Sequence, residues 1–388
     1  MPEPLSLYLH LPFCHKICPY CSFYKHTPGK TDFTAFINAL LEEAKRRNDE
    51  LENRPLRTIY LGGGTPSLLS EKHLSHLFTG LQDIFDLSQI EEIDLEANPS
   101  TFHLPKAQLF RDLGVTRVSL GVQSFQEKEL KALGRDHTAQ AAAESFALLR
   151  EAQIPSCNLD LMFSVPHQTE KSWADNLSQA LALQPDHISC YNLTYEEDTA
   201  YFDQFQKGEL SDDPDLNARL FTLAHETLTA SGFCHYETSN YSTPGHHSKH
   251  NLSYWEGRDY LGLGPSAVST VGITASTDHK LQPAPTTPPS HTHSIRWKNT
   301  PDTAAYIHQI NTVGHAMQET EHLTQEQYHL ERIALLLRTD TGLPLHYLSP
   351  HTTLDFLIEN NLANLTETHL ILTREGSLLV DAIAEQLS

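Results

Sequence analysis

From Ser6 to Leu193, short runs rich in β-forming residues alternate with amphipathic stretches, and this alternation is the strongest constraint on the fold. It is typical of repeated βα units, in which the strands form a parallel sheet. Six strands are predicted, at residues 6–11, 56–61, 92–97, 117–121, 156–162 and 187–193. Expected helices include residues 32–47, 71–85, 138–151 and 171–183, where apolar positions recur every three or four residues. Right-handed crossovers then curl the sheet into an open, partial (β/α)6 barrel.

The rest of the 388-residue chain is expected to add two smaller units to this barrel. A single core stops growing at about 250 to 300 residues, so two or three domains are expected. We place the barrel at residues 1–200, a barrel-covering extension with a proline-rich, mobile loop (278–293) at 201–298, and a C-terminal domain at 299–388. Helices are predicted at 300–317 and 324–337, and a helix, short strands around Leu370 and a final helix predict a winged-helix-like α+β ending.

Composition narrows the expected compartment and partners. We find neither a stretch of about 18 apolar residues nor a secretory signal, so a cytoplasmic protein is expected. The net charge is −22, from 27 Lys and Arg against 49 Asp and Glu. This acidic balance opposes phosphate backbones, which argues against a nucleic-acid partner.

Three of the six cysteines are crowded together after the first predicted strand, at Cys14, Cys18 and Cys21. Three thiolates can hold three irons of a four-iron cluster and leave the fourth iron open to a small molecule. A zinc site completed by His15 or His26 is the alternative. The glycines at residues 62–64 follow the second strand, where bare backbone can approach a ligand, and they favour the cluster.

Polar side chains follow the predicted strands at the same end each time. In a parallel barrel these ends meet at one mouth, where ligands bind. The side chains are Thr65, Glu96, Asn98, Gln123, Ser124, Asp160, Asn192 and Thr194. Carboxylates and amides suit the ammonium of an amino acid and the hydroxyls of a ribose, and Arg135 is placed to bind a carboxylate.

Taken together and in order, these motifs resemble the anaerobic coproporphyrinogen oxidase family of radical S-adenosylmethionine (radical SAM) proteins. The resemblance rests on the cysteine loop and on residues 62–66, 96–99, 117–125, 133–135, 159–161, 187–194 and 236–240. It implies that Cys14, Cys18 and Cys21 ligate a [4Fe-4S] cluster. It also implies contacts to S-adenosylmethionine (SAM) from Tyr8, Gly63, Gly64, Thr65, Glu96, Gln123, Arg135, Asp160 and Thr194.

Two departures separate the chain from the oxidases of that family. Phe23 stands where the oxidases carry a further cysteine, and their N-terminal extension is not found ahead of the triplet. In both respects the chain is similar to the haem chaperone (HemW-like) branch. Residues 250–255 match the HNxxYW element of that branch, and the resemblance makes His250 the candidate haem ligand. The alternative is that His250, Tyr254 and Trp255 only pack this region onto the barrel.

The resemblance therefore implies a haem chaperone that carries a [4Fe-4S] cluster and SAM, with haem as its cargo. Expected partners are haem-accepting proteins, among them membrane respiratory enzymes that would place the chain at the membrane periphery, and a second copy in a homodimer. The alternatives are a radical SAM enzyme acting on a tetrapyrrole and a purely structural iron–sulfur scaffold. The residues leave open whether SAM is cleaved or only bound, and they assign no catalytic residue. Coproporphyrinogen oxidase activity is disfavoured.

Overall fold

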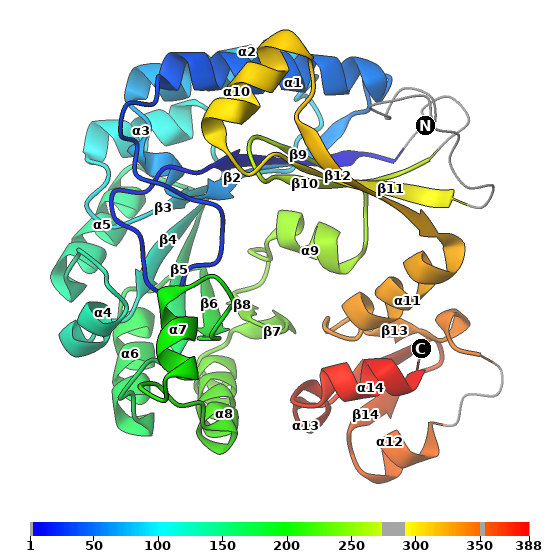
Figure 1. The fold of residues 1–388 in the computed structure, drawn as a ribbon. Coiled ribbons are helices and arrows are strands. Elements are labelled where there is room, and N and C mark those ends of the chain that lie inside the picture. The colour runs from blue at the N-terminus through cyan, green and yellow to red at the C-terminus, as the bar shows by residue number, and fades with distance from the viewer. Residues whose placement is uncertain (1–2, 274–291, 350–353, 388) are drawn as a thin grey trace.

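A curled sheet covered by helices forms the main body of the computed structural model, which describes residues 3–273, 292–349 and 354–387 (Figure 1). Its parallel strands follow one another in chain order: β1 (Leu5–Leu11), β2 (Leu56–Gly63), β3 (Glu92–Ala97), β4 (Arg117–Gln123), β5 (Ser156–Phe163) and β6 (His187–Asn192). Each overlaps a predicted strand, and the partial parallel barrel is confirmed.

Helices follow the strands and cover the outer face of the sheet (Figure 1). They are α1 (Phe33–Glu50), α2 (Glu71–Ile84), α3 (Leu104–Asp112), α4 (Glu127–Ala132), α5 (Ala139–Glu151), α6 (Glu170–Ala182) and α8 (Pro214–Ala230), with the short helix η1 (Pro66–Leu68) after β2. Helix α7 (Ala200–Gln206) lies instead against the cysteine loop, where Tyr201 N donates to Pro19 O (3.0 Å). Several begin at a capping side chain. Asp32 accepts from two backbone amides of α1, and Thr169 forms a reciprocal capping box with Ser172 at the start of α6.

The parallel strands turn an apolar face to the helices and a polar face into the barrel. In β1, Leu7 and Leu9 are buried in the main hydrophobic core, whereas Tyr8 faces a central cavity. In β5, Leu159 joins the core and Asp160 lines the cavity. Successive side chains of a strand point to opposite faces, so this alternation sets every second residue into the interior.

The sheet continues past the six parallel strands on both edges, which the sequence did not predict. The order of its 12 strands is β12-β11-β10-β9-β1-β2-β3-β4-β5-β6-β8-β7. The added strands are β7 (Cys234–Glu237), β8 (Asn240–Ser242), β9 (Tyr260–Leu263), β10 (Val268–Gly272), β11 (Thr292–Asn299) and β12 (Met317–Thr324). Of these, β9 is parallel to β1, and the others pair antiparallel. Most of them are too short to give a clear periodic signal.

The helix predicted at 300–317 is shorter than expected. It is α10 (Thr303–Thr312), and Gly314, with φ +91°, lets the chain turn back as β12 before residue 317. Both α10 and β12 belong to the barrel, because Tyr306 and Ile310 lie in its core and β12 pairs with β11. The proline-rich loop lies outside the described residues apart from its last two, which begin β11.

Helix α9 (Lys249–Trp255) lies on the inner side of the barrel, between the two added edges (Figure 1). Its His250 bonds to Thr58 near the start of β2, and its first backbone amides bond to Glu92, the first residue of β3. The helix therefore closes the barrel at the amino ends of these strands. The cysteine loop lies at the opposite end, after β1.

The C-terminal unit has its own hydrophobic core, which runs from Ile333 to Leu387. It contains α11 (Gln325–Leu336), β13 (Leu343–Pro344), η2 (Leu345–Tyr347), α12 (Asp355–Glu359), β14 (Ala363–Leu365), β15 (His369–Leu372), α13 (Arg374–Ser377) and α14 (Val380–Leu387). The antiparallel order β13-β15-β14, framed by helices, is the winged-helix-like arrangement that was expected. None of the helices within the described ranges is long and apolar enough to cross a membrane.

The buried ion pair between Arg117 and Asp94 (Nε to Oδ2, 2.8 Å) predicts a large stability effect. Asp94→Ala leaves the guanidinium buried without its carboxylate, which we expect to lower the free energy of unfolding by about 3–5 kcal/mol in urea titrations followed by circular dichroism. Glu170→Ala removes the partner of exposed Arg219 and is expected to cost about 1 kcal/mol or less. Equal losses in the two variants would contradict the prediction.

Candidate functional site

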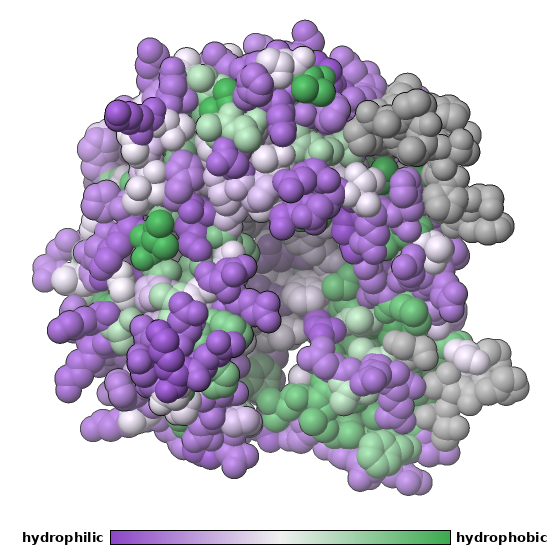
Figure 2. Space-filling view, in the orientation of Figure 1, coloured by the Kyte–Doolittle hydropathy of each residue, from purple (hydrophilic) through white to green (hydrophobic). Residues whose placement is uncertain are grey.

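A cavity of about 650 Å³ lies inside the barrel, between the cysteine loop and α9. Figure 2 shows the hollow near the middle of this face, surrounded largely by hydrophilic side chains. The cavity is lined by every residue that the sequence assigned to the cluster, to SAM or to haem: Tyr8, Cys14, Cys18, Cys21, Gly63, Gly64, Thr65, Glu96, Gln123, Arg135, Asp160, Thr194 and His250. Elements far apart in sequence thus contribute to one site.

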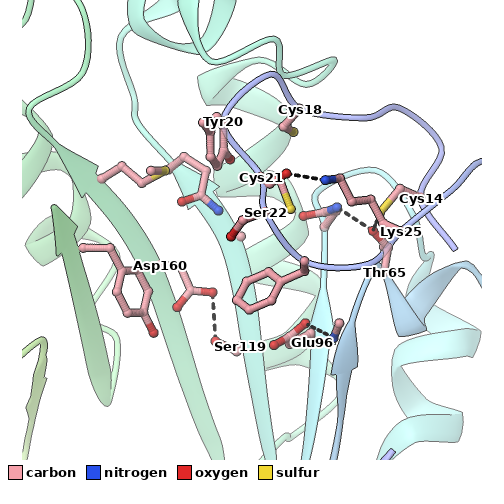
Figure 3. A pocket seen from close by; sticks show the side chains of 18 of the residues that line it. Cys14, Cys18, Tyr20, Cys21, Ser22, Lys25, Thr65, Glu96, Ser119 and Asp160 are labelled. Atoms are coloured by element: carbon pink, nitrogen blue, oxygen red, sulfur yellow. Dashed lines mark hydrogen bonds between the residues drawn. The ribbon is translucent and has the colours of Figure 1, made fainter. Parts of the chain in front are cut away.

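The cysteine loop is a closed ring held by backbone hydrogen bonds. His26 N donates to Pro12 O (2.8 Å), and Cys14 N donates to His26 O (3.0 Å). Cys14, Cys18 and Cys21 are free thiols, each partly exposed, and they surround the upper part of the cavity in Figure 3. Lys25 Nζ bonds to the carbonyl oxygen of Cys21. The short loop therefore presents the three sulfur atoms to the same space.

The thiols fit a cluster whose positive irons displace their protons. Burial raises the pKa of Cys14 to about 11 and also raises that of Cys21, so both are neutral at pH 7 until a metal binds. Within the described ranges, no three His, Cys, Asp or Glu side chains converge closely enough to hold a single metal ion. Three cysteines on one loop match the three thiolate ligands of a [4Fe-4S] cluster that keeps one iron open.

Gly64, the residue after β2, is needed for close contact with the start of the cysteine loop. A Cβ on Gly64 would lie 2.6 Å from Leu11 O and 2.7 Å from Phe13 N. The amide of Gly64 donates to Leu11 O (2.9 Å), and that of Thr65 donates to Phe13 O (2.8 Å). We expected bare backbone there for a ligand. The structure adds a second reason, which is close packing of two backbone segments.

Arg135 places a buried guanidinium between the cysteine loop and the end of β4. Its Nη2 donates to Asn98 Oδ1 (2.6 Å) and to Gly121 O (2.7 Å), and its Nη1 donates to Cys18 Sγ (3.6 Å). Its Nε is buried with no partner in the described part of the chain. Since buried donors are normally satisfied, an anionic ligand group is the kind of partner this side chain fits.

Two carboxylates stand on the inner wall of the barrel. Glu96 accepts from Tyr60 OH (2.8 Å) and from Gly63 N (3.1 Å), and burial raises its pKa to about 7. Asp160 accepts from Ser119 Oγ (2.9 Å), and burial raises its pKa as well. Figure 3 shows both below the cysteine loop. They are suited to accept hydrogen bonds from an ammonium group and from ribose hydroxyls.

Gln123 and Thr194 occupy different surroundings. Gln123 ends β4 with φ +67°, a left-handed conformation that is uncommon outside glycine and often marks a functional position. Thr194 is exposed at the rim and donates to Glu196 Oε1 (2.8 Å). Gln123 is therefore held inside the site, whereas Thr194 reaches the cavity only at its edge.

His250 is buried at the opposite end of the cavity from the cysteines. Its Nδ1 lies 2.8 Å from Thr58 Oγ1, its Nε2 lies 2.9 Å from Tyr254 OH, and its ring centre lies 5.0 Å from that of Tyr60. Burial lowers its pKa to about 3, so the imidazole is neutral at pH 7. Both ring nitrogens are engaged. Binding of iron by Nε2 therefore requires the Tyr254 hydroxyl to move away.

The sequence missed several residues of the wall. Tyr60, Ser119 and Tyr191 line the cavity from within β2, β4 and β6. A prediction from the strand ends alone overlooks positions inside the strands. The missed signal was the alternation inside the strands, where polar side chains occupy every second position although helices cover the other face.

Comparison with known proteins gives concordant matches. Residues 8–180 match the model of the radical SAM superfamily. The haem chaperone HemW of Bacillus subtilis is 32% identical over 387 residues, covering 96% of each chain. HemW of Escherichia coli is 39% identical over 265 residues, covering 68% of this chain and 69% of its own. In structure, the chain is similar to coproporphyrinogen III oxidase (HemN) from Escherichia coli, with a TM-score of 0.78, 23% identity and coverage of 99% of this chain and 90% of the other.

The raised pKa of Glu96 predicts that SAM binding weakens in acid. Below a pKa of about 7 the carboxyl group gains a proton and no longer attracts an ammonium group. We expect the affinity of the cluster-loaded protein for SAM to fall about tenfold from pH 8 to pH 6, in step with the ionised fraction. Anaerobic equilibrium dialysis measures this. Glu96→Gln is the control, because its affinity for SAM varies with pH only through the ligand and the other groups. If this variant showed the same pH dependence as wild type, the prediction would be contradicted.

Proposed function

Because the chain belongs to the HemW family of haem chaperones, within the radical SAM superfamily, we propose that it binds haem and passes it to haem proteins while carrying a [4Fe-4S] cluster and SAM. One observation carries the proposal. A single cavity is lined at one end by the three cysteines and at the other by His250, Asn251 and Tyr254 of α9. A site for a cluster and nucleotide and the element associated with haem thus face the same space.

Cys14, Cys18 and Cys21 would hold the cluster, which when bound supplies one iron that is open to the amino acid part of SAM. Arg135 is placed to bind the carboxylate of SAM, because its charged side chain lines the cavity. Glu96 accepts from the ammonium group, and Asp160 from the ribose. Tyr8, Gly63, Gly64, Thr65 and Gln123 complete the walls, with Thr194 at the rim.

Haem is proposed to bind against α9 with His250 as an iron ligand. The neutral imidazole is the form that binds iron, and burial keeps it neutral. Tyr254 would release Nε2 when iron binds, and its ring would then be free to lie against the macrocycle. Phe23 adds an apolar side chain at the mouth, 66% exposed, where the oxidases carry a cysteine.

Haem-accepting proteins are the proposed partners, including respiratory enzymes that would bring the chain to the membrane surface. A cytoplasmic location and a homodimer are proposed with them. The net charge of −22 supports partners other than nucleic acid. A radical SAM enzyme acting on a tetrapyrrole is the second candidate, because the complete set of residues expected to bind SAM lines the cavity.

Transfer of intact haem is the outcome that separates the two candidates. We expect the anaerobic, reduced, cluster-loaded protein with SAM and haem to deliver haem of unchanged mass to an apo-haem protein, as followed by absorbance and mass spectrometry. Coproporphyrinogen in place of haem is expected to remain unaltered. A tetrapyrrole of changed mass would reject the chaperone in favour of the enzyme, and absence of both transfer and conversion would reject both.

His250→Ala tests the iron ligand. We expect haem to bind about tenfold more weakly or worse, with a shifted Soret band, since loss even of outer-shell partners of a metal ligand costs about 10–100-fold. Titration of haem at equal cluster content measures this. His76→Ala, which removes an exposed imidazole on α2, should bind haem like wild type. Unchanged affinity and spectrum in His250→Ala would remove His250 from the haem site.

A further inference from the structure

A chain of buried hydrogen bonds links the wall of the proposed SAM site to the start of α9. Asn158 Nδ2 donates to Asp160 Oδ1 (2.7 Å), and His187 Nδ1 lies 2.6 Å from Asn158 Oδ1. His187 Nε2 lies 2.7 Å from Tyr236 OH, which accepts from Ser248 N (3.1 Å). We call these five residues the Asp160–Ser248 chain. It joins β5, β6, β7 and the residue that caps α9.

All the donors in the Asp160–Ser248 chain point toward the Asp160 carboxylate. The amide of Ser248 can only donate, so the hydroxyl proton of Tyr236 is left to donate to His187 Nε2. The neutral imidazole then carries its proton on Nδ1 and donates to Asn158 Oδ1, and the amide nitrogen of Asn158 donates to Asp160. Asn158, His187, Tyr236 and Ser248 are fully buried. Reversing any one bond would leave a buried polar group unsatisfied.

Helix α9 has two supports at its first turn. Glu92 accepts from Lys249 N (2.9 Å) and His250 N (2.9 Å), which ties the helix to β3. The Asp160–Ser248 chain ties the preceding residue to β5, β6 and β7. Ser248 Oγ also accepts from Asn251 N (3.3 Å). His250 is two residues from Ser248, so a shift at the end of the chain moves the proposed haem ligand with it.

We propose that His187 and Tyr236 are positioning residues that couple the SAM site to the haem element, an inference that rests on the proposed function. A ligand hydroxyl that donates to Asp160 fixes the carboxylate that ends the chain. The chain then holds Ser248 and the first turn of α9 in one arrangement. When α9 is already ordered, haem binding loses less conformational entropy, so bound SAM increases the affinity for haem. By linkage, haem tightens SAM binding by the same factor.

Tyr236→Phe is the variant that tests this coupling. It removes one oxygen atom from the chain and keeps the ring, whose centre lies 4.2 Å from that of His247. Tyr241→Phe is the matched control, because Tyr241 is a buried tyrosine of the neighbouring strand β8 whose hydroxyl has no hydrogen-bond partner among the described residues. Each variant therefore removes the hydroxyl oxygen of a buried tyrosine, and only Tyr236 belongs to the Asp160–Ser248 chain.

Haem affinity is measured by Soret titration of the cluster-loaded protein with and without saturating SAM, in the absence of reductant so that SAM stays intact. SAM affinity is measured with and without haem. We expect each ligand to tighten the other about fivefold or more in wild type and in Tyr241→Phe. In Tyr236→Phe, at wild-type iron content, we expect both ligands still to bind. The increase in affinity that each ligand causes in the other then falls below about twofold.

Each outcome decides between the inference and the function on which it rests. A wild-type factor retained in Tyr236→Phe overturns the coupling. If the wild-type protein binds both ligands but neither changes the affinity for the other, the coupling is also overturned, whereas the proposed haem chaperone function is not affected. Failure of the wild-type protein to bind haem rejects the proposed function and the coupling together. If Tyr236→Phe does not fold, His187→Gln replaces it. Glutamine keeps a polar group near the place of Nε2 but none at that of Nδ1, and the same loss is expected.

Discussion

The barrel depends on pairing the polar side chains that its strands turn inward. A parallel sheet covered by helices usually has apolar strands, because both of its faces are buried. Here every second residue is polar, and the cost of burying it is offset only where a partner is in reach. Arg117 pairs with Asp94 across neighbouring strands, and Asn158 bonds to four side chains. Three further polar side chains of the interior, Arg135, Glu96 and Asp160, line the ligand cavity.

The interior is therefore divided into two layers with different roles. Near the amino ends of the strands, His187 bonds to Tyr236, and Glu92 accepts from the backbone amide of His250 in α9. Toward the carboxyl ends, Glu96 and Asp160 keep acceptor capacity directed at the cavity. Inward-facing residues near the amino ends of the strands thus stabilise the fold, whereas those nearer the carboxyl ends are available to bind a ligand. The helix that closes the barrel from below is held by residues of the first layer and contributes His250 to the cavity.

The parallel barrel and most of its site could be predicted because they depend on local patterns. Strand periodicity located β1 to β6, and the shared polarity of strand ends gathered Glu96, Gln123 and Asp160. Among the outer strands, β7, β8 and β9 escaped prediction because three or four residues carry almost no periodic signal. The Asp160–Ser248 chain escaped prediction for another reason. Its members come from different strands, so no single segment of the sequence shows their contacts.

The division of the sheet between early and late parts of the chain has a consequence for the order of assembly. Synthesis releases the amino terminus first, and domains fold as they emerge. The cysteine loop and all six parallel strands leave the ribosome before α9, and the outer edge of β1 has no neighbour until β9 emerges at Leu263. For that interval the nascent barrel is open from below and has a bare strand edge, which is a hazard for aggregation. Until α9 has been made, the cavity beside the cysteine loop also lacks the part of its wall that His250, Asn251 and Tyr254 provide.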